Sequence, residues 1–401
     1  MTMLCIPLPS VNYVPQAMRL QPDLIELKRA DHKVLRDTKG HVRFVDYDWQ
    51  TPLPEVKNLI LSYHNFEETP SDLEGLLKKL KAKSRAQYYK IATMAKSTLD
   101  CFRMLELAQK HSNVIGICMG EDGTPSRILA PLFGTPIMYA SLSPEHATAP
   151  GQLTMQELIG VYHFRKLNKN TLIYAVIGDP VSQSPGHLYH NERLKGEGVY
   201  VKLRIRSEEL SRFFTYVRHL PFKGLSVTIP HKVAVMDYLD VIDPEAKEIG
   251  AVNTIDIRDG KLIGYNTDAL GALGALGEVS GKRVIVLGAG GAAQAIIHGL
   301  LKHHAHVTII NRTRAKAEEL SKRFQCTVGS EEDLKGPYDI LIQATSSDEV
   351  PVLQEGKVVM DISLKETPFL SAARKLGCHV IPGMEMYRIQ AEAQRLKWFS
   401  L

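Results

Sequence analysis

A glycine-rich turn near residue 290 constrains the fold of this chain more than any other segment. The β-branched run Arg283–Leu287 is typical of a strand that is buried on both faces. It ends in Gly288–Ala293, a G-x-G-x-x-A pattern, and the apolar residues of Ala295–Leu301 then recur with helical spacing. Such glycines let the backbone turn tightly and approach a pyrophosphate, which the free N–H groups of the helix N-terminus can hold. The segment therefore predicts a dinucleotide-binding strand–turn–helix unit.

A second strand follows at the spacing that this unit requires. The run His306–Ile310 is β-branched and ends in Asn311-Arg312-Thr313. A site for NAD places Asp or Glu at this position to bind the ribose 2′-hydroxyl, whereas a guanidinium suits a 2′-phosphate. We therefore predict NADP as the cofactor. The alternative is an ordinary α/β turn without a ligand, in which Arg312 is a surface residue.

Length and composition bound the remaining possibilities. The 401 residues suffice for two or three domains, and 44% hydrophobic with 23% charged residues is typical of a globular protein. The net charge of +5 suits an anionic cofactor and substrate, and no basic block with aromatic residues indicates nucleic acid. The five cysteines are widely spaced without a C-x-x-C pair, so we expect reduced thiols and no metal. We find no signal peptide and no apolar run long enough to span a membrane, so we expect a cytoplasmic protein without membrane contact. The sequence does not determine the oligomeric state.

A polar segment, Leu167–Thr171, separates two differently patterned parts of the chain. Behind it we expect a smaller α/β unit (171–265), the dinucleotide-binding unit (266–380) and a C-terminal helix that packs back on the smaller unit (381–401). In front of it (1–167), apolar runs alternate with amphipathic stretches, which favours βαβ units in a parallel sheet or barrel. Seven candidate strands lie there: Met3–Ile6, Leu24–Leu27, Val42–Tyr47, Leu59–Tyr63, Tyr88–Ala92, Val114–Cys118 and Ile137–Ala140.

Two segments before the glycine turn carry groups suited to proton transfer. The strand in Gly224–Lys232 must end at Pro230, which places Lys232 just after the C-terminal end of the strand. Asp268 follows a turn and could pair with Lys232, which would hold the ammonium and tune its proton transfer. Asn253 offers an amide to a hydroxylated ligand. Taken singly, a lysine such as Lys232 is more often a solvated surface residue than a catalyst, and an asparagine beside a turn such as Asn253 is usually structural.

Together with other motifs, these segments resemble the shikimate dehydrogenase family. Seven motifs occur in that family's order and cover nearly everything from Ile173 onward. They are GDPVSQSPGHLYHN (178–191), GLSVTIPHK (224–232), AVNT (251–254), GYNTD (264–268), GAGGAA (288–293), NRT (311–313) and GMEMYRIQA (383–391). The resemblance implies a substrate-binding domain over 171–265 and a Rossmann-type NADP domain over 266–380.

The resemblance also implies a role for each matched position. Lys232 and Asp268 would be the catalytic pair beside the C3 carbonyl of 3-dehydroshikimate, with Lys232 donating a proton while NADPH delivers a hydride. Ser184 would bind the substrate carboxylate. Thr228, Asn253 and Gln390 would contact the ring hydroxyls or the carboxylate of the substrate. The cofactor contacts would be Gly288, Gly290, Gly291, Ala292, Asn311, Arg312, Thr313, Lys316 and Gly383.

Two positions depart from this family's pattern. The first motif usually reads S-x-S-P, and at equal motif length Gly186 replaces the second serine, for which Ser182 could substitute only if the loop shifts register. The late D-x-x-Y motif lacks its tyrosine, because Asp361 is followed by ISLKET. Both changes affect carboxylate recognition and leave the hydride chemistry in place. Quinate or a related acid is therefore an alternative substrate.

The front part offers a lysine inside an apolar strand. Lys90 lies in YYKIA, where burial would lower its pKa and make the amine a nucleophile towards a carbonyl. His64 ends another strand and can move protons near neutral pH. In a barrel both side chains could reach the carboxyl ends of the strands, where such sites lie. On these two residues alone, a structural lysine and histidine remain the simpler interpretation.

Four front motifs resemble type I 3-dehydroquinate dehydratase, in the right order: SYHNFEETPS, YYKIATM, GEDGTPSRILAPLFG and ATAPGQL. The resemblance implies that Lys90 forms a Schiff base with 3-dehydroquinate and that His64 is the general acid and base. Arg127 would bind the substrate carboxylate, and Thr148 and Gln152 would close the site, with Thr148 in place of the family's serine. Acidic positions of the family are matched by Glu26 and Asp46.

The beginning of this part departs from the dehydratase pattern. Lys28 replaces the arginine of the family's E-x-R motif, and the next strand of the family has no counterpart between Asp31 and Val42. With seven strands in roughly 165 residues, we predict an incomplete or distorted (β/α) barrel. Two hypotheses stay open: a bifunctional enzyme that produces 3-dehydroshikimate in front and shikimate behind, or a dehydrogenase whose front module is not catalytic.

Overall fold

The computed structural model describes residues 1–29, 32–53 and 55–399. Its internal contacts divide the chain into two compact units. The first unit comprises residues 1–176 and 184–222, and the second comprises residues 177–183 and 223–401. No helix in the described ranges combines the length and the apolar character needed to cross a membrane.

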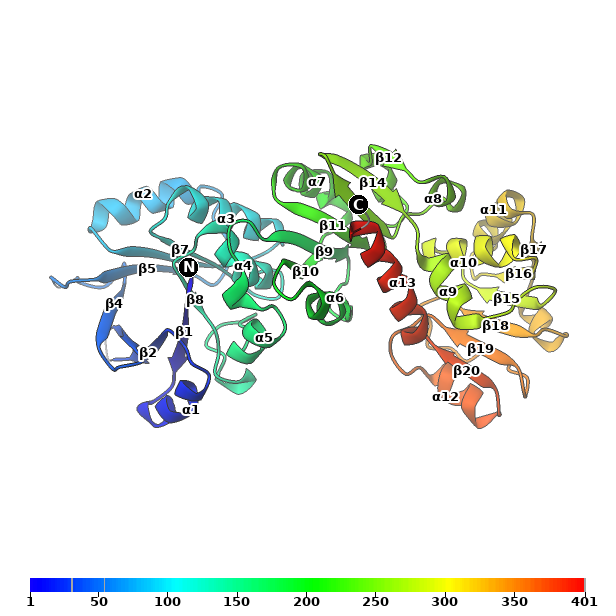
Figure 1. The fold of residues 1–401 in the computed structure, drawn as a ribbon, viewed down its shortest axis with the longest axis horizontal. Coiled ribbons are helices and arrows are strands. Elements are labelled where there is room, and N and C mark those ends of the chain that lie inside the picture. Colours follow the sequence, from blue (N-terminus) through cyan, green and yellow to red (C-terminus); the bar gives the residue numbers. More distant parts are fainter. Residues whose placement is uncertain (30–31, 54, 400–401) are drawn as a thin grey trace. The chain divides into compact units, whose positions relative to one another are not determined.

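The first unit is built around one eight-stranded sheet with the order β7-β6-β5-β4-β3-β2-β1-β8 (Figure 1). Every neighbouring pair is parallel except β2–β3 and β3–β4. The end strands β7 and β8 contact each other, so the sheet is a nearly closed barrel. Its strands are β1 (Met3–Leu8), β2 (Leu24–Lys28), β3 (Lys33–Asp37), β4 (Val42–Asp48), β5 (Leu59–Asn65), β6 (Tyr88–Met94), β7 (Val114–Met119) and β8 (Ile137–Tyr139).

The seven strands expected in the front part are confirmed, but the count was one short. The additional strand β3 (Lys33–Asp37) forms an antiparallel hairpin with β4 and pairs with β2 on its other side. The sequence gives no clear strand signal for β3, because only Val34 and Leu35 are apolar and buried and charged residues flank them. A hairpin also needs few residues, whereas a parallel crossover needs a dozen or more. The barrel is therefore distorted by a hairpin and is not missing a strand.

Helices alternate with several of these strands along the chain. They are α1 (Val14–Arg19), α2 (Leu73–Lys83), α3 (Leu99–Lys110), α4 (Thr124–Leu129) and α5 (Met155–Gly160). Leu73, Leu77 and Leu80 lie on one face of α2 because their spacing follows the helical period, and they pack in a core with β5, β6 and α3. Asp72 caps this helix by accepting a hydrogen bond from Gly75 N at 2.7 Å.

The rest of the first unit packs on the barrel through α7. This part contains most of β9 (Leu172–Gly178), α6 (Gly186–Leu194), β10 (Gly198–Arg204) and α7 (Leu210–His219). The ring of Phe102 on α3 packs against Phe213 and Tyr216 of α7 at centroid distances of 6.4 and 5.0 Å. Arg206 also forms a 3.1 Å ion pair with Asp122, which lies in the loop after β7. Residues 184–222 therefore share a core with the barrel.

The second unit begins with a mixed sheet, in which four strands are neighbours in the order β11-β13-β14-β12. They are β11 (Phe222–Val227), β12 (Val241–Ile242), β13 (Thr254–Arg258) and β14 (Lys261–Tyr265), and α8 (Pro244–Ile249) follows β12. Strand β13 is antiparallel to both β11 and β14, and β12 is parallel to β14.

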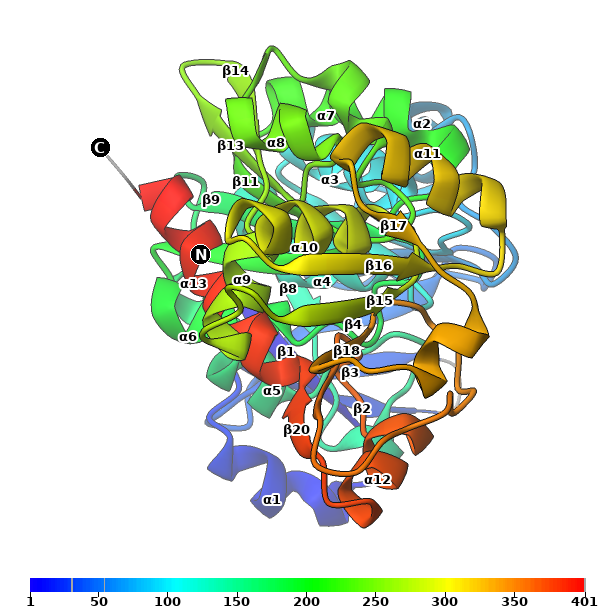
Figure 2. The same cartoon turned by 90° about the vertical axis from the view of Figure 1, so that its right-hand side faces the viewer.

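A six-stranded parallel sheet follows, with the order β17-β16-β15-β18-β19-β20. In chain order this is 3-2-1-4-5-6, the arrangement of Rossmann folds. The strands are β15 (Arg283–Leu287), β16 (His306–Ile310), β17 (Thr327–Val328), β18 (Ile340–Gln343), β19 (Val358–Asp361) and β20 (His379–Pro382). The helices are α9 (Asp268–Leu276), α10 (Gly291–Lys302), α11 (Arg314–Phe324), α12 (Pro368–Lys375) and α13 (Gly383–Phe399) (Figure 2). The predicted bounds of β15 and β16 are confirmed.

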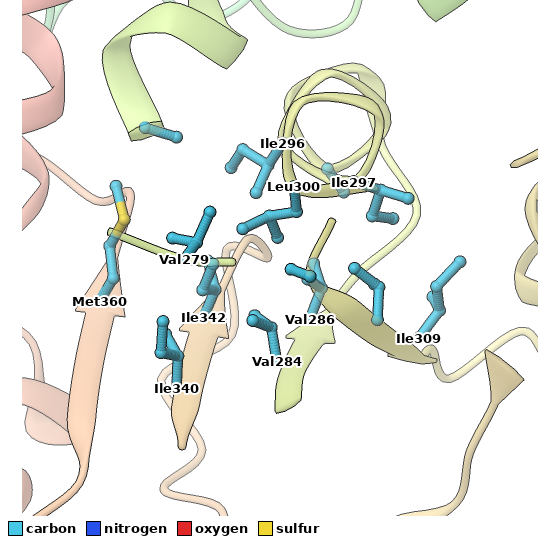
Figure 3. Close-up of a cluster of buried hydrophobic side chains, with 14 of the residues drawn as sticks. Val279, Val284, Val286, Ile296, Ile297, Leu300, Ile309, Ile340, Ile342 and Met360 are labelled. Carbon is cyan, nitrogen blue, oxygen red and sulfur yellow. The ribbon is translucent and has the colours of Figure 1, made fainter. Parts of the chain in front are cut away.

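The core between α10 and this sheet explains why the glycine turn is held rigidly. Ile296, Ile297 and Leu300 of α10 face Val284 and other apolar side chains of the sheet (Figure 3). Each such side chain stabilises the fold by about 1.5–3 kcal/mol when fully buried. Strand β15 and α10 are thereby fixed on both sides of the turn that joins them.

Candidate active sites

In the second unit, the structure brings Lys232 and Asp268 together. Lys232 lies in the turn after β11, and Asp268 is the first residue of α9. The Lys232 Nζ donates a hydrogen bond to Asp268 Oδ2 at 2.5 Å. Asn253 Nδ2 donates to the other carboxylate oxygen, Asp268 Oδ1, at 2.8 Å. Both oxygens of Asp268 are thus engaged, which fixes the position of the ammonium.

A buried amide network supports this pair. Asn253 Nδ2 lies 3.0 Å from Thr267 Oγ1 and 3.3 Å from Gln390 Oε1, and the Thr267 hydroxyl donates to the same Gln390 oxygen at 3.2 Å. Gln394 Nε2 donates to Asn253 O at 3.1 Å, and its Oε1 accepts from Ser226 Oγ at 2.9 Å. Thr267 and Gln394 were not among the site residues predicted from the sequence. The signal for Gln394 was its position one helical turn after Gln390, on the same face of α13.

The glycine turn lies directly beside Lys232. An added Cβ at Gly291 would lie 3.0 Å from the Lys232 Cβ. Gly288 has a φ of +118°, and a Cβ there would lie 2.9 Å from Ala344 O, at the end of β18. The strands β15 and β18 are neighbours at the point where the strand order reverses, which is where ligands bind in open α/β sheets. A dinucleotide whose pyrophosphate is held at this turn would therefore pass close to Lys232.

The residues predicted to hold NADP fit that group. Gly290 is the N-cap of α10 and has nothing within 4 Å of an added Cβ, which leaves room for a pyrophosphate. Asn311 Nδ2 donates to Thr313 O at 2.9 Å and shapes the turn after β16. Arg312 and Lys316 are exposed, and neither forms an ion pair among the residues that the structure describes. Two free cations suit a 2′-phosphate.

Three other residues predicted to bind the substrate or the cofactor pack against or hydrogen-bond to neighbouring residues. Thr228 packs its Cγ2 where a Cβ on Gly178 would lie, and its N–H donates to Ile177 O at 2.9 Å. A Cβ at Gly383 would lie 2.3 Å from Ser363 O, so glycine lets α13 begin against the chain after β19. Ser184 belongs to the first unit, where its Oγ accepts a hydrogen bond from Gly186 N at 3.3 Å. Its contact with a substrate carboxylate stays a prediction.

The structure gives a physical reason for Gly186. A Cβ at this position would lie 2.8 Å from Tyr200 Oη and 2.9 Å from its ring carbon Cε1. The buried Tyr200 side chain therefore occupies the space that a serine at position 186 would need.

In the first unit, Lys90 is buried inside the barrel beside Asp46. Its side chain is 4% exposed, and its Nζ donates to Asp46 Oδ2. The other carboxylate oxygen, Asp46 Oδ1, accepts a hydrogen bond from Ser62 Oγ at 2.7 Å. The Lys90 Nζ also lies over the Tyr139 ring, 5.1 Å from its centroid.

The sequence-based expectation for the pKa of Lys90 was wrong. Burial does lower the pKa of Lys90, but the carboxylates of Asp46 and Glu26 outweigh burial and raise it. Lys90 is therefore an ammonium in the resting protein. It must transfer a proton before its amine can attack a carbonyl.

His64 is a neutral imidazole at neutral pH. Burial and the positive charge of Lys90 lower the pKa of His64 to about 4, although Asp48 acts against this shift. The His64 Nδ1 lies 3.2 Å from Asp48 Oδ2. A neutral imidazole can accept a proton, so His64 has the protonation state that a general base requires.

Arg127 is a buried cation without a carboxylate partner among the described residues. Its residue exposure is 2%, and Nη1 makes a long hydrogen bond of 3.4 Å to Tyr139 O, while Nε has no partner. Burial lowers the pKa of Arg127 to about 10, which leaves the guanidinium charged at neutral pH. The two cations contact different parts of Tyr139: Lys90 lies over its ring, whereas Arg127 bonds to its backbone carbonyl. A buried unpaired guanidinium is suited to an anionic ligand.

Glu26, Thr148 and Gln152 complete the predicted front set. Glu26 is buried, and its Oε1 lies 3.7 Å from Lys33 Nζ. Lys33 lies on β3, the strand that the sequence did not reveal, and was missed for the same reason. Thr148 and Gln152 bond to each other, with Thr148 N donating to Gln152 Oε1 at 2.7 Å. Their loop after β8 is therefore closed upon itself.

Comparisons with known proteins match both parts of the chain. Family models match as Type I 3-dehydroquinase over residues 16–169, as shikimate dehydrogenase substrate binding domain over 176–255, and as shikimate / quinate 5-dehydrogenase over 271–370.

Two curated relatives span both regions. The shikimate biosynthesis protein AroDE of Chlamydia pneumoniae is 36% identical over 361 residues, which cover 86% of this chain and 74% of that protein. The bifunctional 3-dehydroquinate dehydratase/shikimate dehydrogenase of Arabidopsis thaliana is 36% identical over 383 residues, which cover 85% of this chain and 63% of that protein.

A solved structure matches the rear part. It is shikimate 5-dehydrogenase from Thermus thermophilus in complex with NADP(H) and shikimate. The TM-score is 0.53 at 32% identity, and the match covers 58% of this chain and 94% of that chain.

Proposed function

This chain belongs to the family of bifunctional type I 3-dehydroquinate dehydratase/shikimate dehydrogenase proteins, and we propose that it catalyses two consecutive reactions of the shikimate pathway. The front barrel dehydrates 3-dehydroquinate to 3-dehydroshikimate. The second unit reduces 3-dehydroshikimate to shikimate with NADPH. The observation that carries the reduction is the Lys232–Asp268 pair beside the glycine turn.

In the reduction, NADPH supplies the hydride to the C3 carbonyl carbon when it is bound. Lys232 donates the proton to the carbonyl oxygen, so that the C=O bond becomes a CH–OH group. Asp268 stabilises the ammonium before the transfer and orients its N–H bonds, because its second oxygen is held by Asn253. General acid catalysis of this kind contributes about 10²–10⁴ to a rate. Arg312 and Lys316 would hold the 2′-phosphate of the bound cofactor.

In the dehydration, Lys90 is the nucleophile. Its ammonium first releases one proton, and the resulting amine adds to the C3 ketone of 3-dehydroquinate. The carbinolamine oxygen then takes up a proton and leaves as water, which gives an iminium ion that acidifies the neighbouring C–H group. His64 removes that proton and then protonates the departing hydroxyl group, which leaves as water. Hydrolysis of the iminium releases 3-dehydroshikimate and restores Lys90, so that one water molecule is lost overall. Arg127 pairs with the substrate carboxylate.

Borohydride trapping tests the front reaction. Reduction of the iminium converts it to a stable secondary amine, so treatment of the protein with 3-dehydroquinate and borohydride should add the mass of the bound ligand to the peptide that contains Lys90. The Lys90→Met variant is the control and should carry no label. If the wild-type protein carries no label, the dehydratase proposal is wrong and the front barrel is a non-catalytic module of a dehydrogenase.

The choice between shikimate and quinate needs its own assay. Gly186 is explained by packing against Tyr200, so its presence does not favour quinate. Steady-state oxidation rates with each acid should favour shikimate. A clear preference for quinate would overturn the assignment.

A further inference from the structure

The Glu26 carboxylate in the barrel has one oxygen near a cation and one without a partner. Its Oε1 lies 3.7 Å from Lys33 Nζ, while its Oε2 is buried and has no hydrogen-bond partner in the described part of the chain. A buried carboxylate oxygen left without a donor is costly unless a ligand supplies that donor. The substrate proposed above is a hydroxylated cyclic acid, and its hydroxyl groups are suitable donors.

The hairpin of β3 and β4 determines where Lys33 lies. In the antiparallel pairing, Lys33 is directly opposite Asp46 on β4 and directly opposite Lys28 on β2. Directly opposed residues of antiparallel strands have side chains on the same face of the sheet. Glu26 lies two residues before Lys28 and therefore shares that face. Strand β3 thus places Lys33 on the face of the sheet that also carries Glu26 and Asp46.

We propose that Lys33 is a positioning residue of the front site, which holds Glu26 so that its free oxygen accepts a hydrogen bond from a substrate hydroxyl group. This proposal rests on the dehydratase function proposed above. Lys28 replaces the arginine expected in this part of the site, and Lys33 supplies a cation to Glu26 from the neighbouring strand. Its side chain is 36% exposed, so the cation reaches Glu26 from the edge of the site without the cost of complete burial.

The charges around Glu26 show why a cation is needed there. Lys33 on β3 and Lys90 on β6 favour its ionised form, and Asp46 on β4 opposes it. Burial raises the pKa of Glu26, and Lys90 and Lys33 act against this increase. The remaining neighbours that titrate, Cys5 on β1 and Tyr139 on β8, are neutral because burial raises the pKa of both well above its usual value. Without Lys33, Glu26 shares Lys90 with Asp46, which already binds it directly.

Three variants of the full-length chain test the role of Lys33. We expect Lys33→Met to raise the KM for 3-dehydroquinate about tenfold or more with a smaller change in kcat, because the lost group orients the substrate and does not react. Lys33→Arg keeps the cation and should restore most of the wild-type KM. The matched control Lys39→Met removes the same charge from the exposed turn at the other end of the hairpin and should leave both constants unchanged.

A pH profile adds a readout that a structural role would not change. With Lys33→Met, the acid limb of kcat/KM for dehydration should move to higher pH, since Glu26 then protonates more readily. The dehydrogenase activity of the same preparations reports that the variants are folded in the second unit, and borohydride labelling of Lys90 reports that the barrel site is intact.

Each result bears on a different claim. An unchanged KM and pH profile in Lys33→Met overturns the role of Lys33. So does an equal loss in Lys33→Met and Lys33→Arg, because a purely structural position would lose function with either. If the wild-type protein neither dehydrates 3-dehydroquinate nor becomes labelled, the proposed dehydratase function fails, and the role of Lys33 fails with it.

Discussion

The Nζ of Lys232 lies 2.5 Å from Oδ2 of Asp268, although 36 residues separate the two in the chain. The first residue follows β11 of the mixed sheet, and the second begins the helix that leads into the Rossmann sheet. Gly291, the first residue of α10, lies against the same lysine. Lys232, the proposed proton donor, is therefore held by Asp268 at the start of α9 and lies against Gly291 of the glycine turn.

Replacing Lys232 with Met should lower kcat for the reduction of 3-dehydroshikimate by about 10²–10⁴, the usual contribution of a general acid. The dissociation constant for NADPH should change little, because the cofactor contacts remain. Stopped-flow absorbance measures the first quantity, and quenching of protein fluorescence measures the second. The control Lys247→Met removes an exposed lysine of α8 and should retain full activity. A Lys232→Met protein with most of its rate would exclude the catalytic role.

Arg312→Ala should raise the KM for NADPH roughly 10–100-fold, because a hydrogen bond between charged groups contributes about 1.5–3 kcal/mol. The KM for NADH, which lacks the 2′-phosphate, should stay the same. Lys322→Ala, in the last turn of α11, is the control for a general loss of positive charge. Equal effects on NADPH and NADH would show that Arg312 does not select the phosphate.

The stability of the first unit should fall as the pH decreases from about 6.5 to about 4. His64 has its pKa lowered to about 4 in the folded protein, so in this range the unfolded chain binds a proton that the folded chain does not, and stability rises with pH. The contribution is at most about 3.5 kcal/mol, from 1.4 kcal/mol per pKa unit. The pKa of His187, in the same unit, is also lowered to about 4 by burial. Urea unfolding should show a smaller pH dependence for His64→Gln, and identical curves would contradict the assigned pKa shift.

Gly186→Ser would restore the family's residue but should destabilise the first unit by about 1–3 kcal/mol, the usual cost of overpacking. The new Cβ would lie 2.8 Å from Tyr200 Oη. Thermal unfolding measures the loss, and the double variant Gly186→Ser with Tyr200→Phe should regain part of it. An equally stable single variant would mean that Tyr200 does not exclude the serine.

The elements best predicted from sequence are those with a strong local signal. The strand Arg283–Leu287 and its neighbour His306–Ile310 are continuous β-branched runs, and the structure has them with the same bounds. Strand β3 had no such signal, because two buried residues between charges do not define a period. Helix α10 begins at Gly291, earlier than the predicted Ala295, because the turn glycines themselves enter the helix.

The pairs that form each site depend on tertiary structure. The sequence suggested that Lys232 meets Asp268, and the structure joins them. The sequence could not show that Asp46 contacts Lys90 from another strand. This contact reverses the expected pKa shift of the lysine. Lys33 was invisible for a related reason, since its place beside Glu26 depends on the register of a hairpin.

A coupled assay tests whether one chain carries out both reactions. Purified protein is given 3-dehydroquinate and NADPH, and the loss of NADPH absorbance is followed. We expect steady oxidation of NADPH by the wild-type protein. The Lys90→Met variant should lose this reaction but still oxidise NADPH when 3-dehydroshikimate is supplied. Oxidation of NADPH by the wild-type protein with 3-dehydroshikimate but not with 3-dehydroquinate would contradict the claim.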